Sequence, residues 1–127
     1  MNAAYEAMTP LDIEAQLNAV RNEITRAQGD LRAARIAETK AKVALKRAEI
    51  VAAHDVPPVK RGSDISNADA RKEAIFERCV TPWQELEQAT TLREIAQEAL
   101  RVKLADAEIL RSLGSSVRAS YEMAGRG

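Results

Sequence analysis

The side chains that most often act as nucleophiles or metal ligands are scarce in this sequence. It has one histidine, His54, and one cysteine, Cys79, so a zinc site would need several carboxylates to converge. His54 lies at the end of a predicted helix, where it can interact with the helix dipole. Cys79 follows Ile75 and Phe76 on an apolar stripe and has no histidine near it in the sequence, which is typical of a small buried side chain. We therefore predict no catalytic residue, no metal site and no cofactor.

Motifs that bind phosphate groups or nucleic-acid bases are also missing. Gly29 is isolated and Gly62 stands in a basic turn, so neither begins a phosphate-binding loop. Acid pairs such as Glu94 and Glu98 are abundant, but on helices they normally form a solvated face. The four aromatic side chains are too few for a base-stacking platform. We expect a protein that is not an enzyme and has no small-molecule substrate.

The composition is that of long helices. The chain has 127 residues, enough for one helical domain, and it is 46% hydrophobic but only 3% aromatic. Ala, Glu, Arg, Leu and Lys make up just over half of it, as in coiled coils. Its 19 basic and 19 acidic side chains cancel, so no net charge draws it to nucleic acid or to a membrane surface.

Several features predict a cytoplasmic protein. No apolar run reaches the length of about 18 residues that a transmembrane helix needs. Residues 1–6 have neither a basic region nor an apolar run, so we expect no secretory signal. A single cysteine excludes an intramolecular disulfide and fits a reducing compartment.

The longest predicted element is a helix over residues 10–54, about 65 Å long. Thr9 and Asp12 have the spacing of a capping box, and Pro10 suits the first turn. Apolar residues then recur at alternating steps of four and three, which indicates the seam of a coiled coil. The predicted seam consists of Ile13, Leu17, Val20, Ile24, Ala27, Leu31, Ala34, Ala41, Leu45, Ala48 and Ala52, with Glu38 as the one acid in the series.

A cluster of helix breakers follows the first helix. Pro57 and Pro58 cannot continue a helix, and they predict a connection over residues 55–65. Ser66 with Asp69 has the spacing of a helix start. We therefore predict a short helix over residues 66–80.

The pair Thr81-Pro82 repeats the cap chemistry of Thr9-Pro10. Because Pro82 cannot donate a backbone hydrogen bond, it favours a break or sharp kink over a continuous helix. The pattern then predicts a long helix over residues 82–113, with Gly114 as its C-cap and a tail or short helix over 115–124. The predicted seam of the long helix consists of Leu92, Ile95, Ala99, Val102, Asp106, Ile109 and Leu113.

Together these elements predict an all-α fold. It is an antiparallel helical hairpin or coiled coil with a short intervening helix and a break or kink near Pro82. A fold point near Lys60 would place Glu38 opposite Pro82. There the carboxylate would either accept hydrogen bonds from N–H groups freed by a kink, or extend toward solvent at a loosely packed point.

The first helix has a second apolar face. Ile36, Val43 and Ile50 recur every seven residues on another side of the helix from the seam. A two-helix hairpin can bury only one face of this helix, and large exposed apolar stripes are rare on monomers. The second face therefore predicts a third layer, made by the short helix, by another copy of the chain or by a foreign protein. Trp83 is a further candidate, either filling the notch at the break or anchoring a partner.

Charge is segregated along the chain. Residues 30–61 hold eight basic and four acidic side chains, and residues 64–99 hold four basic and eight acidic ones. Packed side by side, the two segments would neutralise each other. The alternatives are a basic strip that binds nucleic-acid phosphates and an acidic segment that mimics nucleic acid. The basic strip would use Arg35, Lys42, Lys46, Arg47, Lys60 and Arg61.

Small hydroxyl side chains and arginines alternate in residues 110–125, which read LRSLGSSVRASYEMAG. This stretch resembles the ending of small helical-hairpin proteins encoded by tailed bacteriophages. The resemblance implies a phage accessory protein that acts in replication, recombination or host takeover in the host cytoplasm, and it assigns no functional residue. We expect the chain to self-associate or to dock on a host or phage protein. A nucleic-acid-binding accessory factor and an acidic inhibitor of a host nuclease or defence protein are the alternatives.

Overall fold

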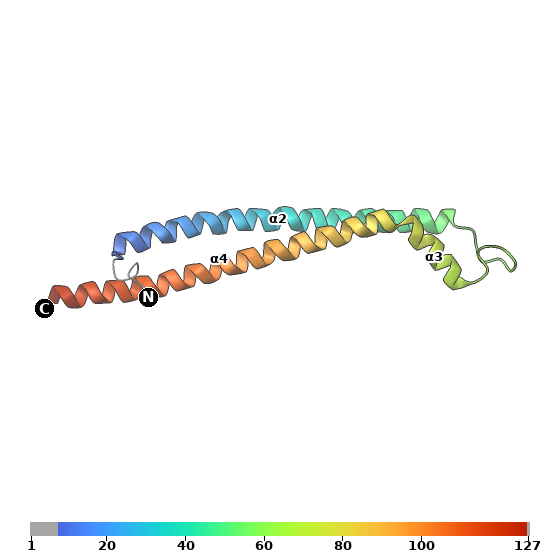
Figure 1. Ribbon diagram of the computed structural model, residues 1–127. Helices are drawn as coiled ribbons and strands as arrows, with labels where there is room; N and C mark the ends of the chain where they lie inside the picture. Colours follow the sequence, from blue (N-terminus) through green and yellow to red (C-terminus); the bar gives the residue numbers. More distant parts are fainter. Residues whose placement is uncertain (1–7, 127) are drawn as a thin grey trace. The chain divides into compact units, whose positions relative to one another are not determined.

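A computed structural model describes residues 8–126, which contain three helices and no strand. Helix α2 spans Pro10–Asp55, α3 spans Ala68–Arg78 and α4 spans Val80–Arg126. The two long helices, α2 and α4, pack antiparallel, with α3 between them in the sequence (Figure 1). The predicted all-α helical hairpin with a short intervening helix is therefore confirmed.

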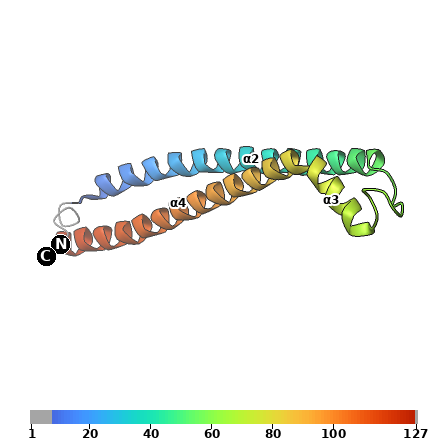
Figure 2. The same cartoon turned by 45° about the vertical axis from the view of Figure 1, so that its right-hand side comes forward.

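The contacts divide the chain into two compact units. The first unit combines the described residues up to Leu31 with those from Ala96 onward, and the second unit comprises Arg32–Ile95. Both long helices contribute to both units, whereas α3 belongs to the second alone. At the break before α4, the axis of α3 turns away from that of α4 (Figure 2).

Helix α2 begins with the predicted capping box. The Thr9 hydroxyl accepts a hydrogen bond from the Asp12 N–H at 3.2 Å, and the Asp12 carboxylate accepts one from the Thr9 N–H at 2.9 Å. These backbone and side-chain hydrogen bonds from Thr9 hold the pKa of Asp12 below its ordinary value. Two N–H groups at the helix start, which have no partner within the helix, are thus satisfied reciprocally.

The predicted seam of α2 is confirmed throughout. Every predicted seam position from Ile13 to Ala52, Glu38 included, is buried or half-buried. Every other position from Leu11 to Asp55 is exposed. In the second unit the seam is rich in alanine, whose short side chain allows neighbouring helices to approach closely.

The inward face of α4 differs from the predicted one. Leu92, Ile95, Val102 and Ile109 are between 43% and 62% exposed, and only Asp106 and Leu113 of the predicted seam are half-buried. The inward positions again follow steps of three and four, in another register along the helix. They are Leu86, Ala89, Arg93, Ala96, Leu100, Lys103, Ala107, Leu110, Gly114 and Val117.

The inward face of α4 fits the seam of α2 better than the predicted stripe through Leu92 and Ile95 would. Its small side chains suit the alanines of the α2 seam, so the helices can pack closely along it. Arg93 and Lys103 cover apolar surface with their stems and direct their charged ends to acids. Arg93 meets Glu38 in the second unit, and Lys103 meets Glu23 in the first.

Helix α4 continues to Arg126, so the predicted end at 113 and the separate segment over 115–124 are wrong. Gly114 is buried inside the helix rather than at its C-cap. A Cβ at this position would lie 3.0 Å from Cγ2 of Ile13, which is itself only 2% exposed. The glycine is therefore explained by the close approach of Ile13, although glycine disfavours a helix interior.

The break predicted near Pro82 is present, but it lies at Cys79. α3 ends at Arg78, Cys79 has φ −110° and ψ 8°, and α4 begins at Val80. A proline ring clashes with the carbonyl four residues before it, which here is that of Arg78. In the first turn of α4 this conflict is absent, and the missing N–H of Pro82 would have no intrahelical partner in any case. The predicted bounds of 66–80 and 82 thus become Ala68–Arg78 and Val80.

The connection between α2 and α3 contains a tight turn. The Lys60 N–H donates to the Ile65 carbonyl at 2.9 Å, and the N–H and hydroxyl of Ser63 both donate to the Lys60 carbonyl, at 3.2 and 2.7 Å. Gly62 has a φ of 84°, in the left-handed region that other residues rarely adopt. The turn therefore depends on glycine at position 62.

Two polar side chains fix the start of α3. Asn67, rather than the predicted Ser66, is the N-cap, because its side-chain oxygen accepts a hydrogen bond from the Ala70 N–H at 2.8 Å. Arg71 donates from Nη2 to the carbonyl of Ala53 at 2.8 Å. That carbonyl lies in the last turn of α2 and has no partner within its own helix, so this bond ties α3 to the end of α2.

Replacing Gly29 and Gly114 separately by alanine should give different results. Both lie inside long helices, where alanine is favoured over glycine by about 1 kcal/mol. A methyl group at position 29 would project into open space, so Gly29→Ala should raise the free energy of unfolding by about that amount. At position 114 the methyl group meets Ile13, so Gly114→Ala should gain less or lose stability. Urea denaturation followed by circular dichroism measures both, and equal gains would show that Ile13 does not pack against position 114.

Candidate protein-interaction surface

The second apolar face of α2 remains uncovered. Ile36 is 51% exposed, Val43 43% and Ile50 70%. With seven-residue spacing they lie roughly 180° around the helix from the middle of the buried seam. The short helix α3 therefore does not cover this aliphatic face (Ile36, Val43 and Ile50).

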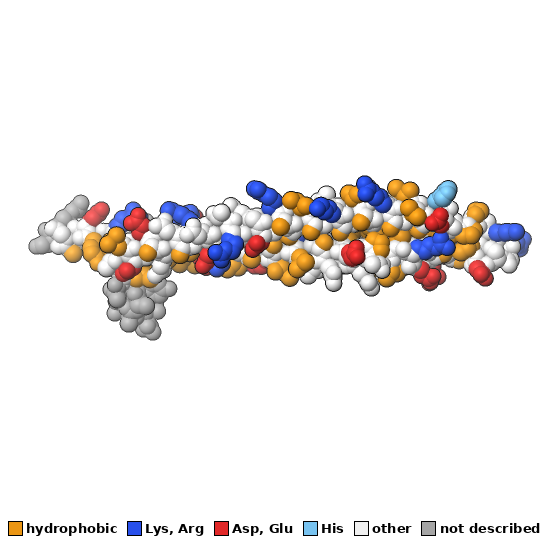
Figure 3. Space-filling model, turned by 90° about the horizontal axis from the view of Figure 1, so that it is seen from above, with side chains coloured by type: hydrophobic (Ala, Val, Ile, Leu, Met, Phe, Trp, Pro, Cys, Tyr) orange, Lys and Arg blue, Asp and Glu red, His pale blue; other side chains and the backbone are white. Residues whose placement is uncertain are grey.

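Cationic side chains surround the aliphatic face. Residues three and four positions apart are neighbours on a helix surface, so Val43 adjoins Lys40, Lys46 and Arg47. All three cations are exposed. Figure 3, which looks onto the side of α2, shows hydrophobic and cationic side chains interleaved in the stretch that leads to the single histidine. The surface is thus an apolar stripe with a basic border.

The six candidate nucleic-acid contacts do not form one strip. Arg35 and Lys42 lie on the side of α2 next to the seam, and Lys42 is 3.8 Å from the Glu38 carboxylate. Lys46 and Arg47 lie farther around the helix, beside Val43. Lys60 and Arg61 belong to the turn after α2. The structure therefore spreads these cations over several sides of the second unit.

Trp83 does not fill the break as a buried plug. It is 42% exposed and meets Phe76 edge to face, with ring centroids 5.9 Å apart. Both rings line a cavity of about 300 Å³ beside the buried Cys79. Leu45, Glu49 and Ala53 of α2 also line this cavity. They lie on a different side of the helix from the aliphatic face. Trp83 and the aliphatic face are therefore separate features.

The sequence interpretation missed a second exposed apolar surface, on α4. Leu92 and Ile95 are each 60% exposed in the second unit. They lie three residues apart and so share one side of the helix. The spacing of Leu92 and Ile95 predicts the seam, whereas the structure places both side chains outward. A second series of apolar residues runs through Leu86 and Ala89 and resembles the alanine-rich seam of α2. This series could have indicated that Leu92 and Ile95 point outward.

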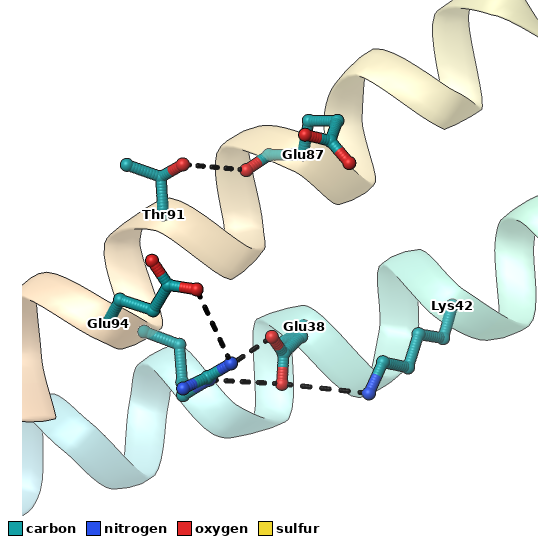
Figure 4. Close-up of polar contacts among 6 residues, drawn as sticks. Glu38, Lys42, Glu87, Thr91 and Glu94 are labelled. Atoms are coloured by element: carbon teal, nitrogen blue, oxygen red, sulfur yellow. Dashed lines mark hydrogen bonds and ion pairs between the residues drawn. The ribbon is translucent and has the colours of Figure 1, made fainter.

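Glu38 is the one buried charged residue in the described range, at 9% exposed. It accepts hydrogen bonds from Arg93 Nε at 3.4 and 3.2 Å, and Figure 4 shows Glu38 between α4 and Lys42 of its own helix. Burial raises the pKa of the Glu38 carboxyl, but hydrogen bonds from Thr90 and Arg93 and the charges of Arg93 and Lys42 outweigh this and hold the pKa below its ordinary value.

The partner of Glu38 is thus Arg93, and neither predicted role for this carboxylate is correct. It neither accepts from N–H groups at the break nor extends alone into solvent. Because α3 belongs to the connection, the midpoint of the hairpin lies near residue 65 rather than at Lys60. This shift brings Arg93, not Pro82, opposite Glu38.

Ion pairs that join α2 to α4 in the described range include Glu38 with Arg93 and Glu23 with Lys103. Neither pairs a base of the basic segment with an acid of the acidic segment, and the neutralisation of the two segments stays a prediction. The first pair uses an acid from the basic segment and a base from the acidic segment. It therefore leaves the charge surplus of each segment larger than the sequence count suggests.

Comparisons with known proteins assign no family or function to the chain. No family model, no curated protein and no solved structure matches the chain. Between residues 8 and 126, no cluster of three His, Cys, Asp or Glu side chains is placed to hold a metal ion. None of the described helices combines the length and hydropathy needed to cross a membrane.

Replacing Glu38 by glutamine should change the pH dependence of stability. Because the folded-state pKa is lowered, the ionised carboxylate stabilises the fold above the ordinary value of 4.5, and this contribution is lost as the pH falls through the folded-state pKa. Glu38→Gln should therefore lower the Tm at neutral pH, and its difference from the parent should shrink in acid. Glu85→Gln is the control, because Glu85 is exposed and forms no ion pair in the described range. Equal, pH-independent changes in both variants would contradict the role of Glu38.

Proposed function

We propose that this chain is a non-enzymatic helical module that binds another protein through the aliphatic face of α2. The observation that carries the proposal is the exposure of Ile36, Val43 and Ile50 on a helix that already buries a complete seam. Exposed apolar surface bordered by polar residues commonly marks a protein-binding site. Anchors at regular helical spacing are also how an amphipathic helix fits a groove or a second helix.

The size of the side chains makes this face an effective anchor. Burying a branched aliphatic side chain completely stabilises a complex by about 1.5–3 kcal/mol before the costs of association. Three of them in one row can provide a contact core, and the surrounding cations can select an acidic partner. The resemblance of residues 110–125 to phage proteins extends the proposal to a phage accessory role with a host or phage protein as partner.

Nucleic-acid binding is the second candidate. It is favoured by Arg35, Lys46 and Arg47, which are exposed and form no ion pair within the described range. It is weakened by their positions on different sides of α2 and by the contact of Lys42 with Glu38. An acidic inhibitor that mimics nucleic acid would instead use the surplus of carboxylates in residues 64–99.

Photo-crosslinking tests the protein-binding proposal. A benzophenone amino acid at position 43, in the middle of the aliphatic face, should give covalent adducts with protein in a lysate of expressing cells. Position 28, exposed on the same helix two turns before Ile36, is the matched control and should give few adducts. Protein adducts at 43 include those with the chain itself. Equal labelling at both positions, or none at 43, would contradict the proposal.

Titration with labelled duplex DNA and with RNA, at two salt concentrations, tests the second candidate. We expect no binding at physiological salt, because the cations do not line one continuous strip. Phosphate contacts would make the affinity fall steeply with salt, with a log–log slope close to the number of contacts. Tight, salt-sensitive binding that is lost in the Lys42→Ala, Lys46→Ala, Arg47→Ala triple variant would make nucleic-acid binding the leading function.

A further inference from the structure

We propose that the protein bound by the aliphatic face is a second copy of this chain, an inference that rests on the proposed function. The aliphatic face of α2 in one copy would cover the exposed apolar side chains Leu92 and Ile95 on α4 of the other. All of these residues belong to the second unit, Arg32–Ile95. Charge and apolar content favour a second copy over an unrelated protein, and the exposed area of the chain is large enough for such an interface.

The second unit consists of two halves with opposite charge. Its basic half, residues 32–61, holds eight basic and three acidic side chains, and its acidic half, residues 62–95, holds seven acidic and four basic ones. The Glu38–Arg93 pair takes the minority charge from each half. Apart from this pair, the basic half keeps eight basic and two acidic side chains, and the acidic half keeps seven acidic and three basic ones. The basic half of one copy therefore complements the acidic half of another.

Both halves also present apolar side chains among these charges. Val43 adjoins Lys46 and Arg47 on the basic half. On the acidic half, the exposed Glu85 lies seven residues before Leu92 and therefore on the same side of α4. The aliphatic face of α2, with its basic border, can thus pack against Leu92 and Ile95 of α4, which have the acidic Glu85 beside them. Complementary charges of this kind around coiled-coil contacts set the choice of partner.

The exposed area is larger than that of an ordinary monomer. The chain of 13.9 kDa exposes 9542 Å², whereas a folded monomer of this mass exposes about 6,700 Å². The difference exceeds the roughly 800 Å² that each partner buries in a standard interface. The formal net charge of zero adds no long-range repulsion between copies.

Charge reversal in two separate variants tests this pairing. One variant reverses the basic half with Lys46→Glu and Arg47→Glu, and the other reverses the acidic half with Glu85→Lys and Glu87→Lys. All four positions are exposed and form no ion pair in the described range, so circular dichroism should show unchanged helicity. Sedimentation equilibrium should find the parent chain associated at micromolar concentration. Each variant alone should associate at least tenfold more weakly, because the reversed side chains of one copy would then face side chains of the same charge on the other.

The equimolar mixture of the two variants provides the decisive readout. Mixing restores opposite charge across every contact between unlike copies, so the mixture should recover association to within about threefold of the parent. Val43→Lys should also dissociate the parent, and Gln28→Lys should not. A monomeric parent chain, undiminished association of either variant alone, or no recovery in the mixture would each overturn the inference. A monomeric parent that still crosslinks to a foreign protein from position 43 would overturn this inference and leave the proposed function standing.

Discussion

The small side chains between α2 and α4 are the constraint on which the rest of the structure depends. Alanine recurs along the seam of both long helices, and Gly114 extends the pattern where Ile13 packs against α4. Short side chains let the backbones approach, so weak dispersion contacts accumulate along the seam. In the second unit the seam of α2 is mostly alanine, whereas Val43 and Leu92 lie outside the seam and remain exposed. One packing choice therefore accounts both for the hairpin and for its exposed apolar surfaces.

The α2 seam of the second unit is mostly alanine (Ala34, Ala41, Ala48 and Ala52), and such a seam defines its register poorly, since one alanine fits much like the next. In the second unit the Glu38–Arg93 pair supplies the missing specificity. A slide by one turn would leave a buried carboxylate without its partner, and an unpaired buried charge is strongly unfavourable. A polar residue at a seam position is a known means of fixing register in coiled coils. We therefore interpret this pair mainly as a determinant of alignment.

The sequence predicts α2 and its seam correctly because one apolar series dominates that helix and a capping box marks its start. In α4 two series compete, and the more aliphatic one, through Leu92, points outward. Choosing between them requires knowledge of the facing helix, which a single-helix pattern does not contain. The wrong prediction of Gly114 as a C-cap has the same cause, because only the position of Ile13 distinguishes a packing glycine from a C-cap. The seven-residue spacing of Ile36, Val43 and Ile50 predicts that the aliphatic face is exposed. Which charged residues of α4 lie beside Leu92 and Ile95 depends instead on the register in which α4 packs against α2.

The same seam links folding to binding. Burying an alanine removes much less apolar surface from water than burying valine or isoleucine, so an alanine-rich pair of helices gains little free energy from each contact. Long helices draw most of their stability from packing one face against a partner. In the proposed function, the partner supplies burial of the branched side chains around Val43 that the hairpin itself does not provide. Because such a partner binds the folded chain and not the unfolded one, it also stabilises the helices that carry the face. The outward position of Ile36, Val43 and Ile50 leaves their apolar surface available for burial at that interface.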